Sequence, residues 1–82
     1  MRVIAVSHLR AFWLKYPQAE QALRAWVKAA AAARWEKPSD ITSEFTTAAV
    51  LKSRRIVFNI KGNDYRLIVA VAYRYGAVYV KF

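Results

Sequence analysis

The sequence predicts a small α+β domain in which two N-terminal helices pack on one face of an antiparallel sheet. Up to residue 35, apolar residues recur mostly with helical spacing, and from residue 50 onward the period changes to two. The 82 residues fit one domain, residues 1–82. Hydrophobic residues make up 57% of the chain, which is enough to build a core even at this size.

The first element is predicted to be a buried strand. RVIAV (residues 2–6) is short, β-branched and apolar. Ser7 follows it and is expected to cap the first helix. Four residues with the spacing i, i+3, i+4 and i+7 form the apolar stripe of that helix: Leu9, Phe12, Trp13 and Tyr16.

Residues 18–35 form the clearest predicted helix. Pro17 ends the helix before it or opens this one, because proline fits the first helical turn and not the interior. Trp13 and Trp26 are expected in the core, since large apolar side chains on the helical stripes favour burial. Trp35, near the helix end, is predicted to be the surface tryptophan.

Residues 36–49 are rich in turn and cap formers and predict a connector with at most one helical turn. Beyond it we expect successive antiparallel strands. Residues 61–64 (KGND) and 74–77 (RYGA) are predicted turns, because their glycines tolerate the positive φ of tight hairpins. The predicted strand segments are VLK, RIVFNI, YRLIVAVAY and AVYVKF.

Alternation along these strands predicts two different faces. Bulky residues such as Leu67 and Val69 suit the helix-covered face, whereas Ala70 and Ala72 leave the centre of the other face open. Such a face suits an RNA backbone with one base stacked on an aromatic ring. The alternative is an ordinary solvated sheet face. If the registers align, the second face collects Arg55, Asn59, Lys61, Arg66, Arg74, Tyr79 and Lys81.

The charge balance favours a polyanionic partner. Fourteen Lys and Arg oppose five Asp and Glu, which gives a net charge of +9. Nucleic acid is the first candidate, an anionic membrane surface the second, and a basic protein without a specific partner the third. No stretch approaches the ~20 apolar residues of a membrane-spanning helix, and the N-terminus lacks the apolar run of a signal peptide. We therefore expect a cytoplasmic protein.

Most familiar catalytic sites are excluded by composition. With no cysteine and one histidine, a zinc site is not expected, and the chain has no P-loop or nucleophile elbow. His8 is interpreted as a structural residue at a strand–helix junction, and the five acids suggest no paired-carboxylate site. We accordingly expect neither a metal nor a cofactor.

Cation-based phosphate chemistry remains possible. The ribose 2′-hydroxyl of RNA can attack the adjacent phosphate, and the protein then needs to stabilise charge and move protons. Arg66 and Arg74 are expected to grip the phosphate. Clustered cations depress each other's pKa, so Lys52, Lys61 or Lys81 is a candidate for the proton transfer.

Three segments closely resemble the HigB toxins, which are RelE-like members of bacterial type II toxin–antitoxin systems. They are residues 1–30, the KPSDI connector and VFNIKGNDYRLIVAVAYRYGAVYVKF, of which VFNIKGNxYRL is the most specific. The resemblance implies a RelE-like fold and an mRNA interferase, an endoribonuclease that cleaves messenger RNA on translating ribosomes. It also implies a HigA antitoxin with a helix-turn-helix domain that neutralises the toxin. The toxin and antitoxin together are expected to bind the promoter of their own genes.

The resemblance also assigns residues. The arginine of its YRL motif matches Arg66, which is among the phosphate-contacting residues of RelE-like toxins, and basic residues before it match Lys52, Arg54 and Arg55 loosely. The expected catalytic residues are Arg66, Lys61, Arg74 and Lys81. The expected RNA-binding residues are Lys52, Arg54, Arg55, Asn59, Asn63 and Tyr79.

One departure from the family concerns the C-terminus. HigB relatives continue into a segment resembling GTHxEYD, which supplies part of the RelE-like active site, whereas this sequence stops at Phe82. Three interpretations are open: the sequence omits the tail, the chain has been trimmed, or the natural protein is inactive. The first two are favoured. The competing hypotheses are a non-catalytic RNA-binding module with the same cationic groove and a scaffold that only binds the antitoxin.

Overall fold

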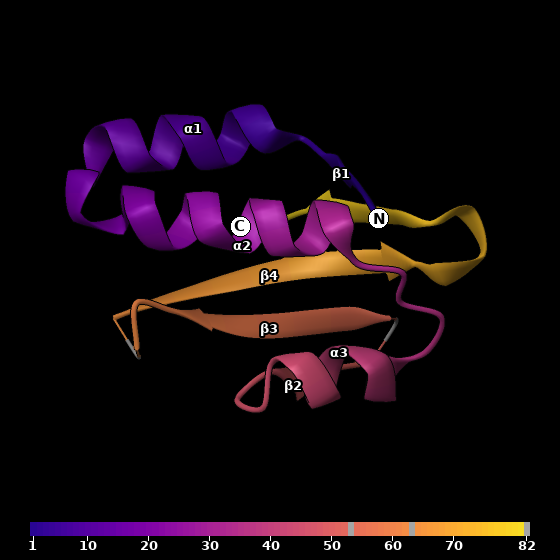
Figure 1. Ribbon diagram of the computed structural model, residues 1–82. Coiled ribbons are helices and arrows are strands. Elements are labelled where there is room, and N and C mark those ends of the chain that lie inside the picture. Colours follow the sequence, from indigo (N-terminus) through magenta and orange to yellow (C-terminus); the bar gives the residue numbers. More distant parts are fainter. Residues whose placement is uncertain (53, 63, 82) are drawn as a thin grey trace.

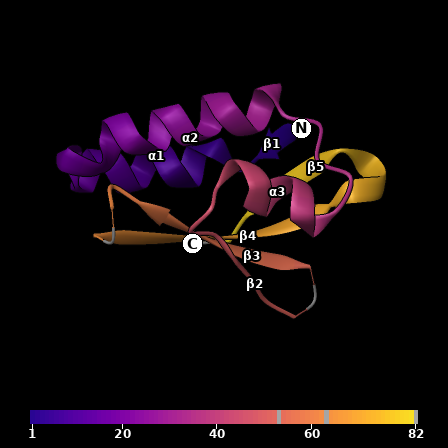
Figure 2. The same ribbon diagram turned by 60° about the horizontal axis from the view of Figure 1, so that its bottom comes forward.

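The computed structural model describes residues 1–52, 54–62 and 64–81. It confirms the α+β prediction, with all helices of this part of the chain on one face of a five-stranded sheet (Figures 1 and 2). The helices are α1 (Val6–Lys15), α2 (Glu20–Ala32) and α3 (Pro38–Glu44). The strands are β1 (Arg2–Ile4), β2 (Ala49–Val50), β3 (Arg55–Ile60), β4 (Tyr65–Ala72) and β5 (Ala77–Val80).

The sheet is mixed, so the prediction of an antiparallel sheet is wrong at one edge. The strand order is β1-β5-β4-β3-β2, and β1 pairs with β5 in parallel while the other neighbours are antiparallel. Arg2 lies opposite Ala77 and Ile4 opposite Tyr79. A short apolar strand carries no signal of direction, because the side-chain period of two is the same in both arrangements.

Helix α1 begins directly after β1. Ala5 adopts the left-handed conformation with φ 71°, and the His8 amide donates to its carbonyl at 3.0 Å. Ser7 is therefore inside the helix, and the prediction that it caps the helix is wrong. The predicted stripe is half confirmed, because Leu9 and Trp13 are buried whereas Phe12 and Tyr16 lie at its exposed margin.

Helix α2 follows a 3₁₀ turn at Pro17–Ala19, so Pro17 opens the second helix, one of the two predicted alternatives. Trp26 lies in the core as predicted. At the other end of α2, the amino group of Met1 donates to the carbonyls of Ala31 and Ala33. A positive group thus satisfies carbonyls that a helix end leaves free.

The connector between α2 and β2 contains more helix than predicted. Helix α3 has seven residues, whereas at most one helical turn was expected. Pro38 occupies its first turn, and the Asp40 carboxylate accepts hydrogen bonds from the amides of Glu36 and Lys37 at 2.9 and 3.2 Å. The turn formers of this segment therefore act as helix starters, a role those residue types also favour.

Trp35 is buried, with 3% of its surface exposed, so its prediction as a surface residue is wrong. Its ring stacks on Phe58 at 6.1 Å between centroids and meets Phe45 edge to face at 6.0 Å. Its Nε1 donates to Glu44 at 3.4 Å. The segment that follows α2 therefore packs on the sheet through Trp35, and this contact places α3 over β3.

The core lies between the helices and one face of the sheet. The residues that point to the helices alternate along each long strand, which confirms the predicted alternation. Apart from Tyr65, which is partly buried, those of β3 and β4 are at most 4% exposed. Burying them supplies most of the stabilisation of so small a domain. These sheet residues are Ile56, Phe58, Ile60, Leu67, Val69, Val71, Val78 and Val80.

Candidate functional site

The sheet face opposite the helices carries half of the predicted site residues. Two rows cross it: Arg55, Ala70 and Tyr79 lie side by side on β3, β4 and β5, and Asn59 lies opposite Arg66. We call this surface the open face; it comprises Arg55, Val57, Asn59, Arg66, Ile68, Ala70, Ala72, Tyr79 and Lys81.

The open face has small side chains, Ala70 and Ala72, at its centre and cationic side chains at its rim. Neighbouring strands are about 4.8 Å apart and alternate residues about 6.7 Å, so the two rows are about 13 Å apart. The Lys81 amide donates to the Ile68 carbonyl at 2.9 Å, which places Lys81 between the rows. Tyr79 is 38% exposed beside Ala70, so its ring is accessible for stacking on a nucleobase.

The chemistry of this face is that of cations and an amide. No Asp, Glu or His of the described strands alternates onto it. Arginine presents planar N–H donors that match phosphate oxygens, and Asn59 adds an amide opposite Arg66. The arrangement can therefore hold a phosphodiester and stabilise additional negative charge on it.

The structure does not bring Lys61 to this face. Lys61 follows the last residue of β3 with φ 53°, so the strand alternation that predicted its side no longer applies. It lines a groove against the alanines of α2 instead. Asn63, predicted to orient the same turn, lies outside the described residues.

Arg74 lies at the other end of β4 from Arg66. The extended strand from Arg66 to Ala72 alone spans about 20 Å, so the two arginines do not grip one phosphate together. Arg74 belongs to a 3₁₀ turn, Tyr73–Tyr75, which interrupts the strand pattern.

Arg74 is instead brought together with Arg54. Both line a hollow of about 320 Å³ next to Tyr73 and Tyr75. Tyr75 is 77% exposed, and the sequence reasoning missed it. A tyrosine next to a glycine with positive φ, here Gly76, is the signal that indicates a projecting turn. Lys52 is exposed in the loop between β2 and β3, and its carbonyl accepts a hydrogen bond from the Arg55 amide at 3.4 Å.

Tyr73 has an unusual environment at the margin of the core. Its hydroxyl oxygen is buried and finds no hydrogen-bond partner in the described part of the chain. Burial raises the pKa of Tyr73, and the Asp40 carboxylate raises it further, while the Arg54 guanidinium opposes the shift. The hydroxyl of Tyr73 therefore stays protonated to a higher pH than that of an ordinary tyrosine.

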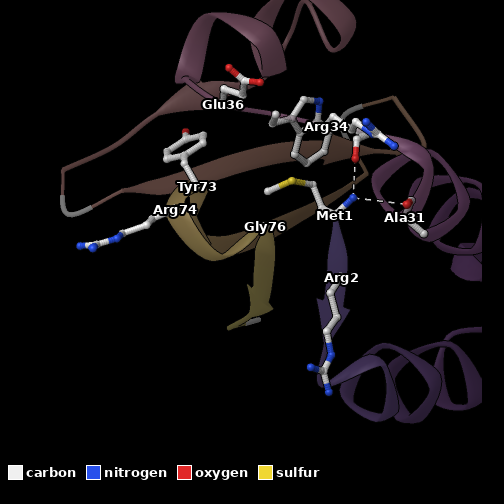
Figure 3. Close-up of a pocket in the computed structure, with 10 residues that line it drawn as sticks. Met1, Arg2, Ala31, Arg34, Glu36, Tyr73, Arg74 and Gly76 are labelled. Atoms are coloured by element: carbon white, nitrogen blue, oxygen red, sulfur yellow. Dashed lines mark hydrogen bonds between the residues drawn. The ribbon is translucent and has the colours of Figure 1, made fainter.

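A second hollow of about 580 Å³ lies beside the N-terminus and includes Arg2, Arg34 and Arg74 in its lining. Figure 3 shows that the side chains of Arg2 and Arg74 extend away from each other, and that the Met1 amino group is engaged by backbone carbonyls. These cations therefore do not converge on one anion.

The described residues contain no group of three His, Cys, Asp or Glu able to hold a metal ion. None of the helices they form has the length and apolar character needed to cross a membrane.

A family model described as HigB toxin, the RelE-like toxic component of a toxin–antitoxin system, matches residues 19–82. The match begins before α2 and includes β3, β4 and β5, so it spans the whole open face. No curated protein matches the chain.

Proposed function

The chain belongs to the HigB toxin family of RelE-like toxic components of toxin–antitoxin systems, and we propose that it is an endoribonuclease that cleaves messenger RNA on translating ribosomes. One observation carries the proposal: Arg66 lies opposite Asn59 on a sheet face where the described strands place no acid, with Tyr79 on β5 and Lys81 directly after it. This face offers donors for phosphate and a ring for a base.

In the proposed reaction, the ribose 2′-oxygen forms a bond to the adjacent phosphorus and the bond from phosphorus to the 5′-oxygen breaks. The products are a 2′,3′-cyclic phosphate and a 5′-hydroxyl. Arg66 stabilises the charge that grows on the phosphate oxygens, and Asn59 donates to the same group. The 2′-hydroxyl proton passes to water, and Lys81 donates a proton to the departing 5′-oxygen.

The remaining predicted residues have supporting roles. Arg55 and Tyr79 flank Ala70 and hold a neighbouring nucleotide by phosphate contact and stacking. Arg54, Arg74 and Tyr75 extend the path of the RNA at the far end of β4. Lys52 contributes to the field that attracts RNA. Lys61 has no place in this site.

The toxin family implies an antitoxin partner. We propose that this partner is a HigA-like protein with a helix-turn-helix domain, and that the pair binds its operator DNA through the antitoxin. The net charge of +9 supports both binding to RNA and neutralisation by an acidic partner.

A second candidate function is binding of RNA without cleavage. It is favoured by the lack of any carboxylate or imidazole on the open face within the described strands, because these are the usual proton-transfer groups. Binding to ribosome-bound RNA that falls steeply with salt, without cleavage, identifies this function.

The test replaces Arg66 with alanine. We expect Arg66→Ala to lower the rate of mRNA cleavage on translating ribosomes about 10²–10³-fold, as losing one charge-stabilising donor does. Lys28→Ala is the matched control, since it removes an exposed cation of α2 on the far side of the sheet. If Arg66→Ala cleaves at the rate of Lys28→Ala, the assignment of Arg66 is wrong.

A further inference from the structure

One edge of β3 lacks a neighbouring strand over its second half. β2 has only two residues, and its register reaches Val57 and Ile56 and no farther along β3. Beyond Val57, no strand of the described residues lies on this side (Figure 1). An unpaired strand edge is a template for another extended chain.

The backbone of Asn59 points toward this free edge. The Leu51 amide donates to the Arg55 carbonyl at 2.7 Å, so Arg55 directs its backbone groups toward the β2 side. In an antiparallel ladder this direction repeats at every second residue. The N–H and C=O of Asn59, four residues on, therefore project from the part of the edge that β2 does not reach.

A groove of about 400 Å³ runs beside the same edge, between β3 and α2. Its wall on α2 is formed by Ala22, Ala25 and Ala29, whose small side chains leave the space, and Phe45 lines it as well. Trp26 also lines it and is 3% exposed, with its Nε1 buried and unpartnered among the described residues. The groove therefore suits an apolar side chain.

The charge at the groove points to an acidic occupant. Lys61 lines it, is exposed, and has no carboxylate within ion-pair distance in the described residues. Three of the five acids of the chain are already engaged: Glu20 with Arg24 at 2.7 Å, Glu44 with Trp35 Nε1 at 3.4 Å, and Asp40 with two amides at its own helix start. Together with the net charge of +9, the exposed Lys61 favours a partner that brings a carboxylate to the groove.

We propose that an extended, acidic segment of the antitoxin pairs with the free edge of β3 at Asn59, with an apolar side chain in the alanine-lined groove and a carboxylate at Lys61. The proposal rests on the family, which implies an antitoxin, and not on RNA cleavage. RNA does not suit this groove, because alanine and aromatic walls offer few donors to phosphate. Toxin activity and antitoxin capture then use opposite faces of the same hairpin.

The test compares two charge reversals of equal size. Lys61→Glu places a negative charge at the groove, and Lys28→Glu makes the same change on α2 away from it. Ala25→Trp is a second, steric variant at an exposed helix position that tolerates a large side chain. The probe is the antitoxin encoded with this toxin, and its dissociation constant is measured by calorimetry with each full-length variant.

We expect Lys61→Glu and Ala25→Trp to weaken antitoxin binding at least about tenfold, and Lys28→Glu to change it less than about threefold. RNA affinity should be the same for Lys61→Glu and Lys28→Glu, because both alter only the overall charge. Unchanged antitoxin binding in Lys61→Glu and Ala25→Trp overturns the proposal. Loss of RNA affinity in Lys61→Glu alone, with antitoxin binding intact, also overturns it and returns Lys61 to the RNA site.

Amide hydrogen exchange tests the strand pairing itself. In the free protein the Asn59 amide is expected to exchange quickly, since it faces solvent at the strand edge. In the complex with the antitoxin it should exchange at least about tenfold more slowly. Equal exchange of this amide in the free and bound states contradicts the pairing. A protein that binds its antitoxin in this way but cleaves no RNA refutes the proposed enzyme and leaves this inference intact.

Discussion

The two faces of the sheet are built from alternate residues of the same strands and yet differ in almost every property. The helix-covered face is apolar and its central residues are at most 4% exposed, while the open face is half-exposed and carries arginine, lysine and asparagine. Neighbouring positions such as Phe58 and Asn59 thus belong to different environments. Because one face maintains the fold, the cations of the other face remain exposed, as the proposed binding of RNA requires.

The division also explains why so basic a chain can be stable. The cations lie where water screens their mutual repulsion, and the described core residues include no buried charge. A substitution on one face is therefore expected to affect unfolding and a substitution on the other to affect RNA, with little overlap. Three changes test this division.

The largest effect on stability is expected for Phe58→Ala. The ring is 1% exposed and lies in contact with Trp26, Trp35 and Phe45, so its loss leaves a cavity and should cost about 3–5 kcal/mol of unfolding free energy. Urea unfolding followed by tryptophan fluorescence measures it. Val57→Ala, the adjacent residue on the open face, is the control and should cost at most about 1 kcal/mol. Equal losses of unfolding free energy in the two variants would mean that both faces contribute equally to stability.

Ala70→Glu tests the open face without touching the core. A carboxylate between Arg55 and Tyr79 should pair with the arginine and repel phosphate, lowering the affinity for a 2′-deoxy-substituted, uncleavable RNA about tenfold or more. Fluorescence anisotropy measures the affinity. Ala70→Gln, of the same size but neutral, should retain most of it. RNA binding by Ala70→Glu at the level of the wild type would remove this row from the RNA site.

The smallest effect is expected for Tyr73→Phe, at the boundary between the faces. The raised pKa of Tyr73 means that the folded state holds the hydroxyl proton more tightly than the unfolded state does. The stabilisation of the folded state that results is fully present below pH 10.0 and is lost as the pH rises above it. Tyr73→Phe should lose less stability than wild type between about pH 8 and about pH 11, as measured by urea unfolding. At neutral pH the two proteins should be nearly equal, because the hydroxyl has no partner among the described residues. If wild type and Tyr73→Phe lose the same unfolding free energy at alkaline pH, burial does not raise the pKa of Tyr73.

Sequence reasoning succeeded where a local pattern decides the outcome. The alternation in RIVFNI and YRLIVAVA specified β3 and β4 and assigned Arg55, Asn59 and Arg66 to one face, because a period of two has only two solutions. The apolar stripes that contain Trp13 on α1 and Trp26 on α2 located the helical core, because apolar residues recurring every three or four positions mark one face of a helix.

It failed where the backbone departs from a regular period or where burial depends on distant residues. Lys61 at positive φ and Arg74 in a 3₁₀ turn both leave the strand alternation that placed them on the open face. Trp35 is buried by Phe45 and Phe58, and nothing in its immediate sequence indicates that contact. The free edge of β3 could not be predicted because it depends on where β2 stops.

The parallel pairing of β1 with β5 has a consequence for how the protein is made. β1 precedes β2, β3 and β4 in the chain, but the strand it pairs with is synthesised after them. Contacts between segments so distant in the chain form late and slowly. The sheet is therefore completed, and the open face with it, only when β5 has emerged from the ribosome.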